Sequence, residues 1–226
     1  LTWGMQSDGI RPAPGPNSAE SDDGLPPGNE VVPGRYTIEL TLGDASGSID
    51  ATVLADARQG ISQEERVAAY EARQALQGLF EASVSALERI VHARADVDTI
   101  MKLISLQPNA DEDESLKDLK TLAGDVKKGL DGLEKRFRTP AETKGIVFDD
   151  DKVTSGINMA MFYVGSAEHP PSPTAQVYVA QARRMLEAGL AEVNDYMVTD
   201  VAGLRNAVNE AGISLLNDTG PVEMPE

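Results

Sequence analysis

Residues 62–108 read SQEERVAAYEARQALQGLFEASVSALERIVHARADVDTIMKLISLQP, and this stretch decides the fold. It opens with Ser62 and Glu65 at the spacing of a capping box, in which each residue satisfies a free amide of the first helical turn. Apolar residues then recur at steps of three and four, as on one stripe of a helix. They are Leu76, Phe80, Leu87, Ile90, Val97, Met101 and Ile104. Pro108 stops the pattern, so we predict one long helix from residue 62 to about residue 106.

The stripe of this helix turns polar at residues 94–96, where Arg94 and Asp96 enter the pattern. If the helix continues through this point, it extends roughly 65 Å at about 1.5 Å per residue. A bend at residues 94–96 is the alternative to an unbroken helix. The pattern alone leaves both open.

Three further helical segments follow along the chain. One begins at the acidic run Asp111–Glu114 and ends at the basic run Lys135–Arg138, and both signs suit the helix dipole. A shorter apolar segment covers residues 153–164. The last begins at Ser172-Pro173, an N-cap followed by proline at the first helical position, and ends at Gly212, which suits a left-handed C′ residue.

Narrow apolar stripes on helical segments with short breaks between them indicate an antiparallel bundle. We therefore assign residues 59–226 to an antiparallel α-helical bundle of about four long helical segments. We expect Leu87, Leu130 and Leu190 to be buried on facing stripes of this bundle.

A different period precedes the helices. Apolar and polar residues alternate over residues 36–42, which is typical of a half-buried strand. The apolar positions are Tyr36, Ile38, Leu40 and Leu42. Residues 43–47 predict a hairpin connection, and residues 49–53 predict the returning strand. Residues 10–33 are rich in Pro and Gly and predict a long loop.

Two strands and the segment around Trp3 are too few for an independent sheet. Either the helices cover this sheet or further strands upstream complete it. The predicted fold is mainly α with a small β part, an antiparallel helical bundle preceded by a partial antiparallel β-sandwich or hairpin. We assign residues 1–58 to a partial immunoglobulin-like β segment with a Pro/Gly-rich loop, and the start at Leu1 suggests a fragment or a processed form.

Composition excludes several classes of function. The formal net charge of −17 argues against nucleic acid, because a phosphate-binding surface needs clustered Lys and Arg, and it disfavours anionic membranes for the same reason. The absence of cysteine removes disulfides, thiolate zinc sites and cysteine nucleophiles. No apolar run approaches the ~20 residues of a membrane span, so we expect no membrane insertion.

Candidate catalytic and metal-binding residues are few. His92 lies within the long helix and His169 in a proline-rich break, and no nucleophile elbow accompanies them, so polar surface residues are the favoured interpretation. Asp149, Asp150 and Asp151 could hold a calcium ion, but their spacing is not that of an EF-hand. An acidic start to the next helix is the favoured interpretation of this loop. We assign no catalytic, cofactor-binding or metal-binding residue, and we expect no cofactor.

Two other groups of residues allow a carbohydrate-related hypothesis. Trp3 and Tyr36 could stack on a sugar, although at this spacing they suit the core of the β segment better. Glycoside hydrolysis needs two carboxylic acids held across a cleft. The acidic residues at 111–114 suit a solvated helix start better than such a site, and the pair Asp22-Asp23 is a weaker candidate still for holding a cation.

Three stretches carry a resemblance to a known family. Residues 1–5 (LTWGM) and 32–43 (VPGRYTIELTLG) are similar to the W-D-x-R … x-P-G-x-Y-x-V-x-L-x-x-G pattern of C-terminal immunoglobulin-like segments in secreted bacterial proteins, with Gly4 in place of the aspartate. The third stretch runs from residue 173 to residue 213. Together they resemble the C-terminal region of BNR-repeat, sortilin-like β-propeller proteins, commonly labelled glycosyl hydrolases.

The resemblance implies an exported protein, extracellular or periplasmic, with a β-propeller upstream of this chain. Any glycosidase chemistry would lie in that propeller, so no catalytic residue carries over. The expected function is a non-catalytic accessory or interaction module whose partner is the propeller or another protein surface. A ligand-binding or sensory periplasmic helical bundle is the first alternative, and a glycoside hydrolase in its own right is the second.

Overall fold

The computed structural model describes residues 2–11, 25–107, 110, 112–140 and 149–213. Its helices are α1 (Gln63–Ser105), α2 (Glu114–Phe137), α3 (Val153–Gly165), α4 (Pro173–Tyr196) and α5 (Ala202–Glu210). A π-helical segment, Met197–Val201, joins α4 to α5 in one continuous run. Before them come the strands β1 (Gln6–Asp8), β2 (Pro27–Glu30), β3 (Gly34–Leu42) and β4 (Ala45–Val53). The prediction of a mainly α fold with a small β part is confirmed.

The helix starts follow from their caps. The Ser62 hydroxyl accepts from the Glu65 amide at 3.2 Å, and the Glu65 carboxylate accepts from the Ser62 amide at 2.8 Å, which completes the capping box. At α4 the Ser172 hydroxyl accepts from the Ala175 amide at 3.2 Å. Both predicted starts are confirmed.

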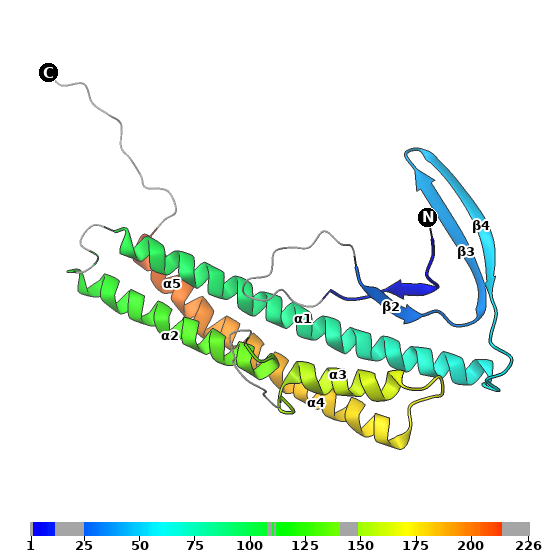
Figure 1. Ribbon diagram of the computed structural model, residues 1–226. Coiled ribbons are helices and arrows are strands. Elements are labelled where there is room, and N and C mark those ends of the chain that lie inside the picture. Colours follow the sequence, from blue (N-terminus) through cyan, green and yellow to red (C-terminus); the bar gives the residue numbers. More distant parts are fainter. Residues whose placement is uncertain (1, 12–24, 108–109, 111, 141–148, 214–226) are drawn as a thin grey trace.

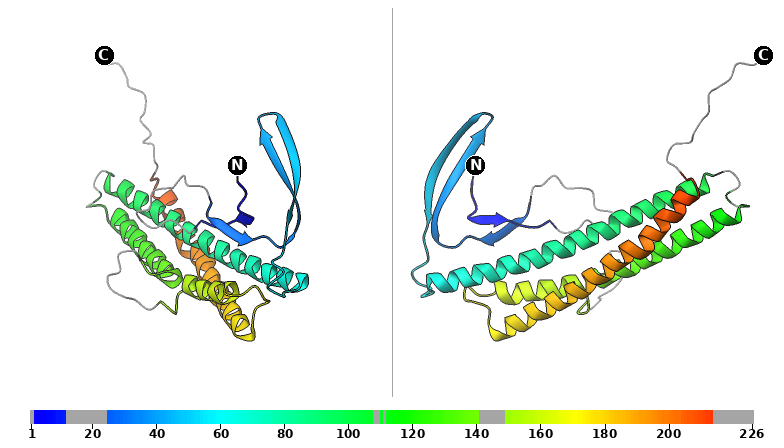
Figure 2. Two further views of the ribbon diagram at one scale, coloured as in Figure 1. Left: turned by 45° about the vertical axis from the view of Figure 1, so that its right-hand side comes forward. Right: turned by 180° about the vertical axis from the view of Figure 1, so that it is seen from behind.

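The helices lie side by side in an elongated bundle (Figures 1 and 2). α1 runs the length of the bundle, α2 and α3 follow one another back along it, and the α4–α5 run returns in the direction of α1. Consequently α1 packs against α3 and α4 near its start and against α2 towards its end, where α2 also packs against α5. This long α1 connects the two halves of the core.

The core is built from the predicted stripes. Leu87 and Leu130 are buried, as predicted, whereas Leu190 is only partly buried and packs at the border of the core. The largest fully buried side chains are Phe137, Leu76, Ile90, Ile104, Leu130, Ile157 and Leu204. Phe137, the last residue of α2, would nearly touch a Cβ placed at Gly189 of α4. A small residue there lets the two helices approach.

The polar residues at positions 94–96 do not interrupt α1, which runs through them as one helix. Arg94 instead pairs with Asp131 at 2.9 Å and with Glu134, both on α2. Arg138 binds the same Glu134 at 2.7 Å. Burial would raise the pKa of Glu134, which is 4% exposed, but hydrogen bonds from Arg138 and Arg94 hold its pKa below the ordinary value. The interruption of the stripe is therefore an ion cluster that joins α1 to α2.

The β part differs from the prediction in two places. β2 (Pro27–Glu30) lies within the predicted loop and pairs with β1 in a two-stranded antiparallel ladder. Both strands of such a ladder are edge strands, where proline is tolerated. The connection of the second hairpin is also shorter than predicted, since only Gly43 and Asp44 lie between β3 and β4. Gly43 has a φ of 60°, which suits the tight turn, so β4 begins at Ala45.

Candidate interaction surface and the adjoining pocket

The β3–β4 hairpin has one apolar and one polar face. In its antiparallel register Tyr36 lies opposite Ala51, Ile38 opposite Ile49, Leu40 opposite Gly47 and Leu42 opposite Ala45. Directly opposite residues share a face, so these side chains form one surface, called the apolar face below. The other face carries the opposite pairs Thr37–Asp50, Glu39–Ser48 and Thr41–Ser46.

The apolar face is open to solvent. The exposed fractions are 37% for Ile38, 54% for Leu40, 82% for Leu42 and 68% for Ile49. Figure 1 shows the reason, since the hairpin rises away from the start of α1 and the bundle does not reach it. The strand is amphipathic as predicted, but the expectation that it is half-buried is wrong. The alternation of residues does not say whether anything covers the apolar side, and the helices do not cover it.

Trp3 extends the apolar face towards the base of the hairpin. Its ring lies 5.3 Å from that of Tyr36, centroid to centroid, at an angle of 57°. The Tyr36 hydroxyl donates to the carbonyl oxygen of Val32, which fixes the ring. The two rings contact one another, as expected of residues in the core of the β segment. Trp3 is nevertheless 36% exposed, so this contact lies on a surface that is open to solvent.

Both outer edges of the hairpin are also free within the described residues, because β3 pairs only with β4 and the β1–β2 ladder is separate. A strand edge presents unpaired N–H and C=O groups that another strand can bind. The hairpin therefore offers an apolar face and two open edges together.

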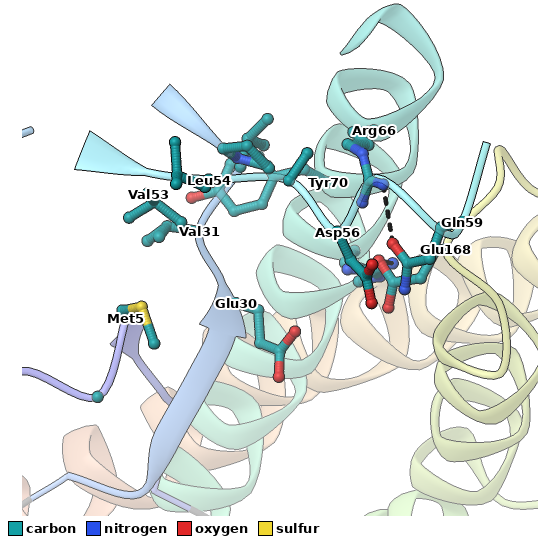
Figure 3. A pocket seen from close by; sticks show the side chains of 15 residues that line it. Met5, Glu30, Val31, Val53, Leu54, Asp56, Gln59, Arg66, Tyr70 and Glu168 are labelled. Atoms are coloured by element: carbon teal, nitrogen blue, oxygen red, sulfur yellow. Dashed lines mark hydrogen bonds and ion pairs between the residues drawn. The ribbon is translucent and has the colours of Figure 1, made fainter. Parts of the chain in front are cut away.

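A pocket of about 270 Å³ lies at the base of the hairpin, where β2, the end of β4 and the start of α1 meet (Figure 3). Its apolar lining includes Met5, Val31, Val53 and Leu54. Its polar lining includes Glu30, Asp56, Gln59, Arg66, Tyr70, Arg73 and Glu168. The pocket thus combines an apolar wall with a charged region.

The arginines of the pocket come from one face of α1. Arg66, Tyr70 and Arg73 are spaced by four and three residues, so they lie in one row. Arg66 is only 9% exposed and donates to the Gln59 side chain at 2.8 Å. Arg73 donates to the Ala167 carbonyl at 3.2 Å. The sequence analysis missed this row, although its helical spacing, beside the core stripe, was a signal that could have revealed it.

The pKa of one pocket carboxylate, Asp56, is shifted in the direction opposite to that of a glycosidase acid. A glycosidase needs a carboxylic acid that stays protonated, which requires a raised pKa. The guanidinium of Arg58 binds Asp56 at 2.7 Å, and this hydrogen bond holds the pKa of Asp56 below its ordinary value. Glu168 accepts from Arg73 at 3.4 Å across the same pocket.

The two histidines lie far apart in the part of the chain that the structure describes. His92 is an exposed residue of α1, whereas His169 lies between α3 and α4 with its Nδ1 3.9 Å from a Glu65 carboxylate oxygen. His169 therefore sits near the start of α1 and His92 some seven turns further along it. Both lie where a polar surface residue is expected.

The aspartates of residues 149–151 lie directly before α3. Asp151 pairs with Lys152 at 2.9 Å, and this hydrogen bond holds the pKa of Asp151 below its ordinary value. Among the described residues no three His, Asp or Glu side chains are grouped as a metal site would require. Asp22-Asp23 and Asp111 lie outside the described residues.

The sequence matches no protein-family model, and no significant match comes from curated proteins or from solved structures. Within the part of the chain that the structure describes, none of the helices has both the length and the apolarity of a membrane span. The hairpin surface and the pocket at its base are thus the features from which a function can be argued.

Proposed function

We propose that this chain is a non-catalytic accessory module that docks on a neighbouring β-rich domain through the apolar face of the β3–β4 hairpin. The observation that carries the proposal is the exposure of Leu40, Leu42 and Ile49 on one face of a strand pair with open edges. A monomeric protein rarely leaves a contiguous apolar patch uncovered unless a partner binds there.

The energy available at this surface is substantial. Burial of a fully exposed Leu or Ile side chain contributes about 1.5–3 kcal/mol, and several such residues share the apolar face. Strand pairing along an open edge would add hydrogen bonds and fix the register of the complex. A surface of this kind suits a partner that is itself a β-sheet.

A second copy of the chain is a poorer partner than a different domain. Two chains with a net charge of −17 repel each other, and the polar face of the hairpin adds the acidic residues Glu39 and Asp50 close to the docking surface. A neighbour that is neutral or basic around an apolar sheet face meets no such repulsion.

We assign the partner to the same polypeptide, upstream of this chain. The resemblance to the C-terminal region of exported BNR-repeat proteins implies a β-propeller in that place. The Trp3 ring contacts Tyr36 of the apolar face, so a domain joined to this chain ahead of Trp3 would begin beside this face. The helical bundle would then space or present the propeller, outside the cell or in the periplasm.

Calorimetry on the separately purified propeller domain and this chain tests the proposal. We expect measurable binding that Leu40→Lys weakens by about tenfold or more, since it places a charge in the apolar contact. Thr41→Lys, one residue along on the polar face, is the matched control and should bind like the unmodified chain. Absence of binding, or equal binding by both variants, would contradict the proposal.

The non-catalytic part of the proposal has its own test. The purified chain should not turn over aryl glycosides or polysaccharides. Turnover that survives repurification and disappears in Glu168→Gln or Asp56→Asn would show that the charged pocket is a hydrolytic site instead.

A further inference from the structure

The pocket at the base of the hairpin contains two donors that are not satisfied. The Nε atoms of Arg66 and Arg73 are both buried, and neither has a hydrogen-bond partner among the described residues. Arg66 is 9% exposed as a whole residue, and the side chain of Arg73 is 15% exposed. Buried guanidinium N–H groups are normally bonded, so both arginines are incompletely satisfied within the chain, and their other N–H groups can bind an acceptor from the pocket that they line.

The position of the two guanidinium groups favours a carboxylate as that acceptor. Arg66 and Arg73 lie on one face of α1 with Tyr70 between them, and all three line the pocket. Arg66 already donates to the Gln59 side chain, and Arg73 already donates to the Ala167 carbonyl at 3.2 Å and to the Glu168 carboxylate at 3.4 Å. The remaining N–H groups match the planar oxygens of a carboxylate, which forms charge-assisted hydrogen bonds with arginine.

The acidic residues of the same pocket restrict the ligand further. Glu30, Asp56 and Glu168 line it together with the arginines, so a ligand with several negative charges would be repelled. A ligand that carries a carboxylate and an ammonium group would pair with the arginines and with the acidic side chains of the pocket. This argues against phosphate or sulfate and in favour of a zwitterion.

The size and the apolar lining complete the description. The pocket measures about 270 Å³, slightly below the roughly 300–1,000 Å³ of sites for drug-sized ligands, so a smaller molecule fits. Met5, Val31 and Val53 provide an apolar wall next to the charged groups. We propose that this pocket binds a free α-amino acid with an apolar side chain, its carboxylate on Arg66 and Arg73 and its ammonium group towards Asp56 and Glu30.

Calorimetry with a matched set of small molecules tests the pocket. The set is alanine, valine, leucine and phenylalanine as zwitterions, 4-methylpentanoate as leucine without the amino group, and 3-methylbutylamine as leucine without the carboxylate. At least one amino acid should bind, and each truncated analogue should bind about tenfold more weakly or worse. Failure of all four amino acids to bind, or equal binding of 4-methylpentanoate, overturns the proposal.

Substitutions of the pocket arginines test whether the amino acid binds in this pocket. Arg66→Gln and Arg73→Gln should each weaken binding of the amino acid about tenfold, whereas Arg183→Gln, at an exposed position of α4, should leave it unchanged. Circular dichroism shows whether the two pocket variants fold. If both pocket variants unfold, Asp56→Asn tests the site instead, because Asp56 is exposed and its substitution should not unfold the chain. This variant should lose the preference for leucine over 4-methylpentanoate. Unchanged binding in the folded variants overturns the site.

This inference does not depend on the docking proposal. Leu40→Lys should weaken docking by about tenfold or more but leave amino acid binding unchanged, because Leu40 does not line the pocket. Loss of both in Leu40→Lys would contradict the separate site.

Discussion

Ile38 lies directly opposite Ile49 in the β3–β4 ladder, and the two side chains share a face on which they remain 37% and 68% exposed. An isoleucine pair across two strands is the normal content of a buried sheet face. Here the rest of the described chain leaves it uncovered, and our docking proposal rests on this exposed apolar face.

Replacement of an apolar-face residue should change surface properties without changing stability. Leu40→Lys should shift the free energy of unfolding by no more than about 0.5 kcal/mol, because Leu40 is 54% exposed. It should also lower the fluorescence of a hydrophobic dye bound to the isolated chain. Thr41→Lys, on the polar face, should leave dye binding as it is. A loss of several kcal/mol in Leu40→Lys would show that the face is covered within the chain.

The core of the bundle should behave in the opposite way. Leu130 is fully buried, so Leu130→Ala should cost about 2–5 kcal/mol through lost burial and the cavity left behind. Leu42→Ala removes the same atoms from a side chain that is 82% exposed and should have almost no effect. Urea melts of the two variants provide the comparison, and equal midpoints would refute the assignment of the core.

The ion cluster between α1 and α2 should be sensitive to substitution. Glu134→Gln removes the negative charge shared by Arg94 and Arg138, and we expect a loss of about 3 kcal/mol, the lower end for a broken buried pair, because both arginines are partly exposed. Glu81→Gln, at an exposed position of the same bundle, is the control. A free energy of unfolding within the error of the unmodified chain would show that the cluster contributes nothing.

The same cluster makes stability depend on pH. The pKa of Glu134 is lower in the folded chain than its ordinary value of 4.5, so its contribution is complete above pH 4.5 and is lost as the pH falls through the folded pKa. Thermal melts between pH 7 and pH 3 should therefore show a smaller acid-induced drop in Glu134→Gln than in the unmodified chain. Parallel curves would contradict the assignment.

Two glycines of α2 should respond differently to alanine. A Cβ at Gly129 would overlap the hydroxyl of Tyr196, which donates to the Val126 carbonyl at 3.1 Å, so Gly129→Ala should destabilise by about 1–3 kcal/mol. A Cβ at Gly132 meets open space, and Gly132→Ala should stabilise the helix by about 0.5–1 kcal/mol. Chemical denaturation of both variants tests whether α2 and α4 approach as described.

Local signals in the sequence predicted the helices well. Ser62 and Ser172 marked two helix starts because a cap depends only on residues within one turn. The polar step at Arg94 could not be interpreted in this way, since its partners on α2 are 37 and 40 residues further along the chain. Interhelical ion pairs of this kind leave no local pattern.

The candidate site was harder to predict than the fold. The alternation from Tyr36 to Leu42 identified the amphipathic strand, but a period of two is the same for a covered and an uncovered face. β2 was missed because Pro27 and Gly28 resemble a loop, although an edge strand tolerates both. The pocket depends on Arg66 and Arg73 meeting the linker and the α3–α4 connection, which only the tertiary structure brings together.

Thiol labelling tests the docking surface most directly, because the chain contains no cysteine. Leu40→Cys and Thr41→Cys place single thiols on the apolar and the polar face of β3. In the isolated chain both should react rapidly with a maleimide. When the chain is bound to the β-propeller domain that we propose as its partner, the thiol of Leu40→Cys should be protected while that of Thr41→Cys still reacts. Equally rapid labelling of Leu40→Cys with and without that domain would contradict the central claim.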